Sequence, residues 1–345
     1  MTTSSRTRRA QPRARLARLA GVAGIAALLA ACGGGGDGDS GDPLVPSAAT
    51  ITAANYEGVA RQVLAATSYM GDATGLVTGA QVAPGPQALF GFARAQVRRL
   101  PGLFASRSPL VTGVITEDSF ECTGGGSVTV RQDDVNGNGR VDVGDSGSLT
   151  ARNCVEDGAT LSGALDIRFS AVNGDLDSDV YAATVSITLR DLRAATPAGN
   201  ATGSGQFTLS LSSASASTSA LALDVSSLAV SGSFGGTADT VTMQNFSLSS
   251  STALAGGRLR TTTSVGGTVG SNNLAGGTVT LATGSPLVQF EGDLHPFSGQ
   301  ITATGAARSQ MRLTVQSATN VLLELDANGD GSFESSTVKT WASLV

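Results

Sequence analysis

The main pattern along the chain is an alternation of apolar and polar residues that runs from about residue 106 nearly to the end. Leu165, Ile167 and Phe169, for example, alternate with Asp166 and Arg168. The same period returns at Val185–Leu189, Phe207–Leu211, Leu221–Val225, Leu228–Val230, Met311–Val315 and Val321–Leu325. Most of the intervening residues are Ser and Thr, which predicts antiparallel strands with one apolar face and one face in water.

Clusters of Gly, Asn and Asp separate these segments and predict the turns. They are Asn173-Gly174-Asp175, Gly235-Gly236, Gly256-Gly257, Gly266-Gly267 and Gly276-Gly277. No stretch with a helical period interrupts residues 106–345, so we expect a mainly β domain built as one large antiparallel meander. A sheet this wide is expected to curl into an open barrel or to split into a two-layer sandwich.

Residues 50–105 have a helical period instead. Thr52 can cap a helix over residues 53–64, and a second helix is predicted over residues 87–100, before Pro101. Each segment has one apolar face at helical spacing, and we expect both helices to pack on the sheet.

Residues 1–31 are typical of an export signal, with six arginines before a short apolar run. The run is too short for a permanent membrane span and ends in Leu29-Ala30-Ala31-Cys32. This ending resembles the lipobox of bacterial lipoproteins, which implies cleavage before Cys32 and lipidation of that residue. Similarity to lipoprotein sorting signals, with Gly33 next to the cysteine, implies anchoring in the outer membrane of a Gram-negative cell envelope. The Gly- and Asp-rich residues 32–49 are interpreted as a flexible tether.

Loss of the leader makes the chain strongly acidic. It leaves 22 − 6 = 16 basic residues against 27 acidic ones, a net charge of −11. Such a chain is a poor candidate for binding nucleic acid or anionic lipid, and is suited to divalent cations.

An acidic loop at residues 134–145 has the ligand spacing of a calcium site. Its positions 1, 3, 5, 7, 9 and 12 are Asp134, Asn136, Asn138, Arg140, Asp142 and Asp145, with Arg140 acting through its carbonyl. The loop resembles those of EF-hands and dockerins, although a strand rather than a helix is predicted after it. The alternative is a hairpin turn rich in Asn and Gly that binds no metal.

A second acidic loop lies near the end of the chain. Asp326, Asn328, Asp330, Ser332 and Glu334 repeat positions 1, 3, 5, 7 and 9, but position 12 is Thr337. A second calcium site and a tight hairpin both remain open.

Cys122 and Cys154 are the only pair left once Cys32 is lipidated, so a disulfide is predicted between them in an exported chain. The alternative is two buried thiols. The segments FECTGGGSVTV, ARNCVEDGATLSG and LELDANGDGSFE, together with the lipobox, resemble β-rich lipoproteins of Gram-negative bacteria, a group with no assigned activity.

Catalytic chemistry is poorly supported by the sequence. His295 is the single histidine, and Gly144-Asp145-Ser146-Gly147 resembles the serine motif of chymotrypsin-type proteases only over those four residues. We therefore expect no catalytic residues. The protein is expected to be a non-enzymatic envelope lipoprotein with a structural, adhesive or binding role. The alternatives are a carrier of apolar ligands or lipids inside the curled sheet, and a hydrolase with its site in the loops.

Overall fold

The computed structural model describes residues 47–74, 84–105, 115–176, 178–197, 199–234, 237–274 and 276–344. The chain divides into two units, residues 1–44 and 45–345, and all described residues lie in the second. The predicted leader, Cys32 and residues 32–46 of the predicted tether lie outside the described residues. The last three tether residues pair with the sheet, because Ala48 bridges Thr278 and the Ala49 N–H donates to the Thr278 carbonyl at 2.8 Å.

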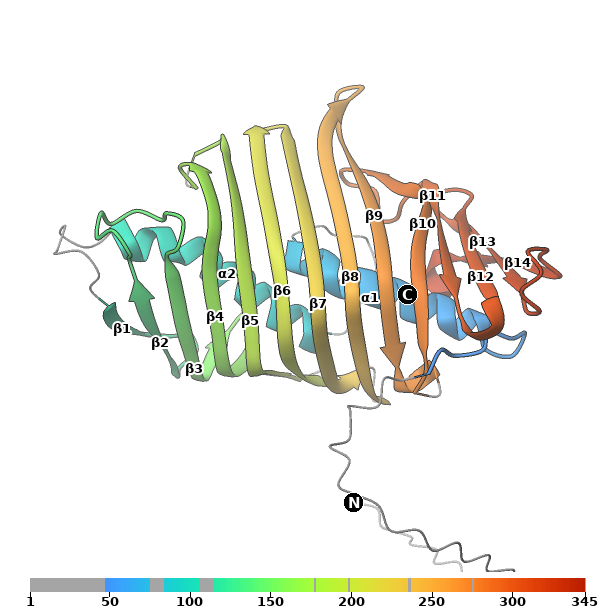
Figure 1. Cartoon of the computed structure of the whole chain (residues 1–345), viewed down its shortest axis with the longest axis horizontal. Helices are drawn as coiled ribbons and strands as arrows, with labels where there is room; N and C mark the ends of the chain where they lie inside the picture. The colour runs from blue at the N-terminus through green and yellow to red at the C-terminus, as the bar shows by residue number, and fades with distance from the viewer. Residues whose placement is uncertain are drawn as a thin grey trace, which may run out of the picture. The chain divides into compact units, whose positions relative to one another are not determined.

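The described chain after residue 115 forms one sheet of fourteen strands, in which every strand pairs with its neighbour in sequence. All of these pairings are antiparallel, which confirms the predicted meander (Figure 1). The sheet stays open, with β1 and β14 as its two edges, so it forms neither a closed barrel nor two separate sheets. Its strands are Ile115–Glu121 (β1), Ser127–Asp133 (β2), Ser146–Glu156 (β3), Ala159–Gly174 (β4), Tyr181–Thr196 (β5), Gly199–Ser215 (β6), Thr218–Phe234 (β7), Thr237–Ala255 (β8), Arg258–Ser271 (β9), Thr278–Phe290 (β10), Ser298–Thr304 (β11), Gln310–Val315 (β12), Asn320–Asp326 (β13) and Ser335–Thr340 (β14).

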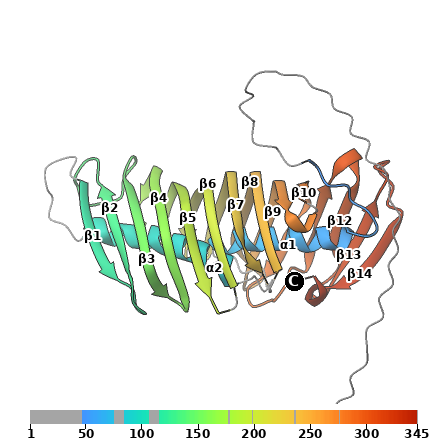
Figure 2. The ribbon, with the colours of Figure 1, turned by 90° about the horizontal axis from the view of Figure 1, so that it is seen from below.

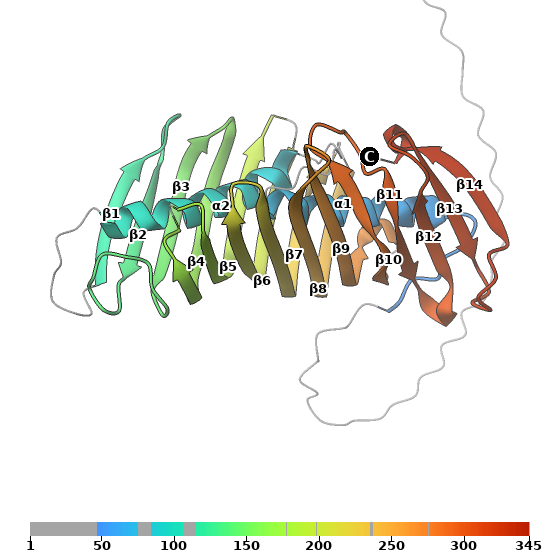
Figure 3. The same ribbon diagram turned by 90° about the horizontal axis from the view of Figure 1, so that it is seen from above.

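Two helices, α1 (Tyr56–Thr74) and α2 (Pro84–Ala105), lie across the strands on one face of the sheet (Figures 2 and 3). α2 contacts β4 to β7, and α1 contacts β7 to β9 and β11 to β13. We call this side the helix-covered face and the opposite side the open face. Within the described residues, three short 3₁₀ helices follow strands: Asn272–Leu274 (η1) after β9, Ala306–Arg308 (η2) after β11 and Trp341–Ser343 (η3) after β14.

The helix bounds differ from those predicted. α1 begins at Tyr56, because Thr52 to Asn55 form a turn in which the Asn55 side chain accepts a hydrogen bond from the Thr52 N–H at 2.8 Å. α2 continues through Pro101 instead of ending before it. Leu100 and Phe104, on either side of this proline, are 0% and 2% exposed, so their burial offsets the lost backbone hydrogen bond.

The core lies between the helices and the sheet. Buried residues extend around more than half of the circumference of α1, because the sheet covers part of this helix and α2 packs against another part. In α2, the Phe90 ring meets the Phe207 ring of β6 edge-on, with centroids 6.2 Å apart. Lys339 of β14 pairs with Glu57 of α1 at 2.7 Å and ties the edge of the sheet to the helix.

A line of β-bulges crosses the sheet from β3 to β9. The extra residues fall at Asn153 in β3, Asp191 in β5, Ser226 in β7 and Asn245 in β8. Each insertion shifts the apolar alternation by one residue, so Leu189 before the β5 bulge and Leu192 after it both face the helices. Bulges increase local twist and bend a strand, which gives the sheet its curl.

Glycine faces several of these bulges on the neighbouring strand. Gly163, Gly205 and Gly267 have φ angles of 120°, 137° and 105°. A Cβ atom on any of them would collide with a backbone oxygen, that of Asp191, Ser227 or Asn245 respectively. Gly266-Gly267, predicted as a turn, therefore lies inside β9, because close approach of β8 requires a residue without a side chain.

Replacement of a bulge glycine should be costly. Gly205→Ala combines a positive φ with a backbone collision, and we expect it to lower the free energy of unfolding by at least about 2 kcal/mol. The control is Gly58→Ala in α1, where an added Cβ meets no atom within 4 Å. Urea unfolding should show this control to be neutral or more stable by up to about 1 kcal/mol, and equal stability of the two variants would contradict the role of Gly205.

Candidate functional site

The first predicted calcium loop, residues 134–145, connects β2 and β3, and we call it loop A. The Asp134 carboxylate accepts hydrogen bonds from the backbone N–H groups of Gly137 and Gly139, at 2.6 and 2.8 Å. Asn136 and Asn138 form similar turns, in which their side-chain oxygens accept from the N–H groups two residues later. These contacts wind the loop around its position 1 carboxylate.

Asp142 lies where the side chains of loop A converge. Its Oδ2 accepts hydrogen bonds from the side-chain amides of Asn136 and Asn138, at 2.8 and 2.6 Å. Two amide N–H donors therefore stabilise the Asp142 carboxylate by hydrogen bonding. Presentation of the two amide oxygens to a cation would require both amides to rotate away from Asp142.

Asp145, at position 12, braces the base of loop A. It is 0% exposed, and its two oxygens accept the N–H groups of Val135 at 2.9 Å and Asp142 at 2.7 Å. Burial raises the pKa of the Asp145 carboxyl, the two backbone hydrogen bonds act in the opposite direction, and repulsion from Asp134 and Asp142 adds to the rise. Both of its oxygens already hold the loop together.

The second acidic loop, residues 326–334, connects β13 and β14, and we call it loop B. Asp326 accepts the N–H groups of Gly329 and Gly331 at 2.7 and 2.8 Å, the same pattern as Asp134. Asp330 accepts the Ser332 N–H at 2.7 Å, and this hydrogen bond is the largest cause that lowers the pKa of Asp330. The two loops therefore share one internal scheme.

Glu334 gives loop B the brace that Asp145 gives loop A. Its Oε2 accepts the N–H of Ala327, the residue at position 2, at 2.9 Å. In loop A the equivalent N–H, that of Val135, donates to Asp145. Position 12 of the predicted motif, Thr337, lies instead in β14. In loop B a carboxylate at position 9 thus accepts the hydrogen bond that Asp145, at position 12, accepts in loop A.

Loop B gathers its carboxylates more closely than loop A. Asp326, Asp330 and Glu334 each offer one oxygen within 4.8 Å of the others. Calcium holds its oxygen ligands at about 2.3–2.6 Å, so two ligands of one ion lie at most about 5.2 Å apart, and the three oxygens fit this limit. Among the described residues, the aspartates of loop A form no such group. The geometry favours loop B, whereas the sequence motif favours loop A.

A disulfide joins Cys122 to Cys154, with the two Cα atoms 5.4 Å apart, which confirms the predicted pairing. It connects the β1–β2 turn to the bulged end of β3. Both cysteines are nearly buried, at 5% and 0% exposure. The bridge closes the segment that contains loop A.

The residues of the partial protease motif are not assembled into a site. Ser146 begins β3, whereas His295 lies in the β10–β11 connection and stacks on Trp341, with ring centroids 5.2 Å apart. Strands β4 to β9 separate these two positions in the sheet. Burial lowers the pKa of His295, and its Nδ1 has no hydrogen-bond partner among the described residues.

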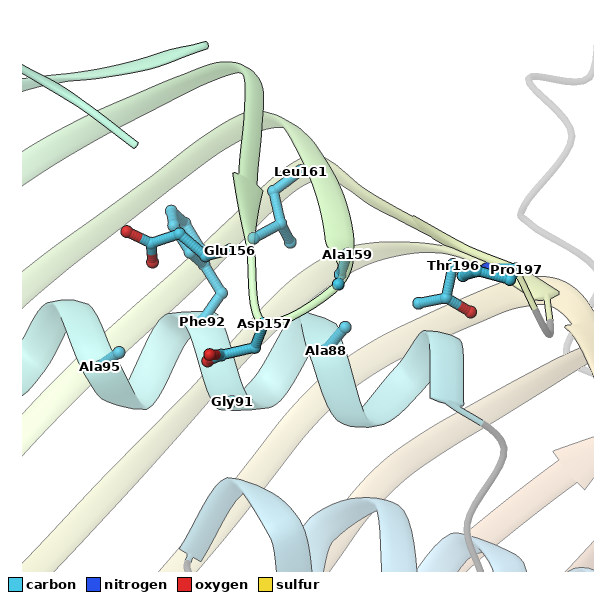
Figure 4. Close-up of a pocket in the computed structure, with 11 residues that line it drawn as sticks. Ala88, Gly91, Phe92, Ala95, Glu156, Asp157, Ala159, Leu161, Thr196 and Pro197 are labelled. Atoms are coloured by element: carbon cyan, nitrogen blue, oxygen red, sulfur yellow. The ribbon is translucent and has the colours of Figure 1, made fainter. Parts of the chain in front are cut away.

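A pocket of about 560 Å³ lies between α2 and the β3–β4 and β5–β6 turns (Figure 4). Its helix wall includes Ala88, Gly91 and Ala95, three small residues that recur on one side of α2. The sequence interpretation missed this pocket. The spacing of the small residues was visible in the sequence, but the turns that form the opposite wall come from distant segments.

Comparisons of the chain with protein-family models, with curated proteins and with solved structures found no match. Over the described part of the chain, neither helix has the length and apolar character needed to cross a membrane.

If the loops bind calcium as their spacing predicts, the ion is expected to stabilise the fold. At a calcium concentration ten times the dissociation constant, the expected gain in unfolding free energy is about 1.4 kcal/mol. We expect Asp330→Asn with Glu334→Gln in loop B to remove most of this gain, and Asp134→Ala in loop A to remove a smaller part. The measurement is the melting temperature with calcium and with chelator. A full calcium response in both variants would show that neither loop binds the ion.

The disulfide should contribute independently of calcium. The two cysteines are 32 residues apart, and closing a loop of this length stabilises the native state by about 3–4 kcal/mol on the chain-entropy model. A double Cys122→Ser and Cys154→Ser variant should show this loss in urea unfolding with chelator present. An unchanged unfolding midpoint would contradict the estimate.

Proposed function

We propose that the chain is a non-enzymatic, lipid-anchored protein of the Gram-negative cell envelope. Its β domain would have a structural, adhesive or binding role and would be stabilised by calcium at the acidic loops. Support for the location comes from Leu29-Ala30-Ala31-Cys32 behind an arginine-rich leader. Support for export also comes from the disulfide, because such bonds persist in oxidising compartments.

The observation that carries the proposed role is the packing of the helix-covered face. A carrier of apolar ligands would need space between the sheet and the helices. Here Val59, Val63 and Met70 of α1 are each 0% exposed, and so are Leu89, Phe90 and Leu100 of α2. This filled interior favours a rigid structural or binding domain over a carrier that encloses lipid.

A hydrolase is also less well supported. The carboxylates of Asp134, Asp145 and Asp326 accept backbone N–H groups inside their own loops. Asp166, on the open face, binds Ser148 at 2.7 Å and pairs with Arg190 at 2.8 Å. Carboxylates engaged in this way hold turns and strands together rather than act as an acid and a base.

Cell fractionation followed by mass spectrometry tests the proposal. The mature protein is expected in the outer-membrane fraction, beginning at an acylated Cys32. The matched control is Cys32→Ser, which retains the β domain and should appear in the soluble fraction. A mature protein that still begins at Met1, or one that fractionates like the Cys32→Ser variant, would contradict the lipid anchor.

A further inference from the structure

The pocket beside α2 lies outside the packed interior. Its floor is formed by Phe92 and Leu161, which are 5% and 2% exposed, and Figure 4 shows the Phe92 ring rising from α2 toward the β3–β4 turn. Its walls are Ala88, Gly91 and Ala95 on one side and Ala159, Thr196 and Pro197 on the other. These walls are largely hydrocarbon.

The volume suits a small organic molecule. Pockets for such ligands typically measure about 300–1,000 Å³ and combine apolar walls with a few polar groups that fix orientation. At about 560 Å³ this pocket falls within that range. The space exists because α2 presents small residues here, and a Cβ added to Gly91 meets no atom within 4 Å.

Two carboxylates line the mouth of the pocket, and they differ in their partners. Glu156 pairs with Arg99 of α2 at 3.1 Å, so its charge is already compensated. Asp157 is exposed in the β3–β4 turn, with a φ of 50°, and no described residue pairs with its carboxylate. Asp157 and Gly91 both line the pocket (Figure 4).

The sign of the charge at the mouth decides which ligand fits. The positive end of α2 is at Pro84, more than one turn before Gly91, and the dipole effect of a helix fades beyond its first turn. The uncompensated charge at the mouth is therefore the negative charge of Asp157, which attracts a cation. The hydrocarbon walls accept an alkyl or aryl group.

We propose that this pocket binds a small organic cation with a hydrocarbon body, of the alkylammonium class. The ammonium group contacts Asp157, and the hydrocarbon lies along Gly91 and Ala95 over Phe92 and Leu161. This site is separate from both acidic loops and requires neither calcium nor the lipid anchor. It can therefore be tested independently of the proposed function.

Three variants of the mature chain test the site, each in a Cys32→Ser background so that no detergent is needed. Gly91→Leu fills the pocket from the helix side. Gly102→Leu is its matched control, since it lies in the same helix and its Cβ also meets no atom within 4 Å. Asp157→Asn removes the charge, and Asn tolerates the left-handed backbone at this position.

The probe is octylammonium, with octanoate as the probe of equal chain length and opposite charge, and binding is measured by calorimetry. We expect octylammonium to bind the parent chain and Gly102→Leu equally, and Gly91→Leu at least tenfold more weakly. Asp157→Asn should weaken octylammonium binding about threefold, as expected for one exposed ion pair, and should reduce the preference over octanoate.

Three results would overturn the proposal. They are undetectable binding of octylammonium at millimolar concentration, equal affinity for octanoate, and binding that Gly91→Leu and Asp157→Asn both leave unchanged. If Gly91→Leu fails to fold, the Asp157→Asn comparison and the preference between the two probes still decide the question.

Discussion

The requirement to cover one apolar face of a very wide sheet governs this structure. Fourteen strands in sequence order present a long row of Val, Leu, Ile and Phe side chains on one side, which a single sheet cannot bury by itself. α1 and α2 cover this face and pack against each other. The bulges serve the same requirement, because they bend the strands and restore the apolar alternation after each bend.

The ends of the sheet depend on polar rather than apolar interactions. Loop A near one edge and loop B near the other both wind around a position 1 aspartate that accepts two backbone N–H groups. A second carboxylate, Asp145 or Glu334, then accepts the N–H of position 2. Hydrogen bonds inside each loop therefore hold the chain in a defined turn, and a bound cation would add to this stability.

The pocket that we propose as a ligand site lies at the periphery of a largely filled domain. The pocket beside α2 is formed where the helix carries small residues and two hairpin turns lie over them. The open face is hydroxyl-rich, and Asp166 pairs there with Arg190. Small-molecule recognition at the edge of the helix layer is compatible with the structural, adhesive or binding role that we propose for this domain.

The sequence by itself predicted the strand periodicity and the wet face, because both depend on neighbouring residues. It also predicted the disulfide, through the expectation that Cys32 is lipidated. It also contained the signal for bulges, since Leu221–Val225 and Leu228–Val230 alternate out of phase, and that signal went unused. Only the tertiary structure decided that α2 continues through Pro101, that Gly266-Gly267 lies inside a strand, and that loop B gathers carboxylates better than loop A. α2 continues through Pro101 because Phe104 is buried, and Gly266-Gly267 lies in a strand because the β8 backbone approaches it closely. In loop B, Glu334 reaches back to the N–H of Ala327. Local sequence specifies none of these contacts. Local sequence patterns express propensities for helix, strand or turn. Packing between distant segments determines where such a propensity is overridden.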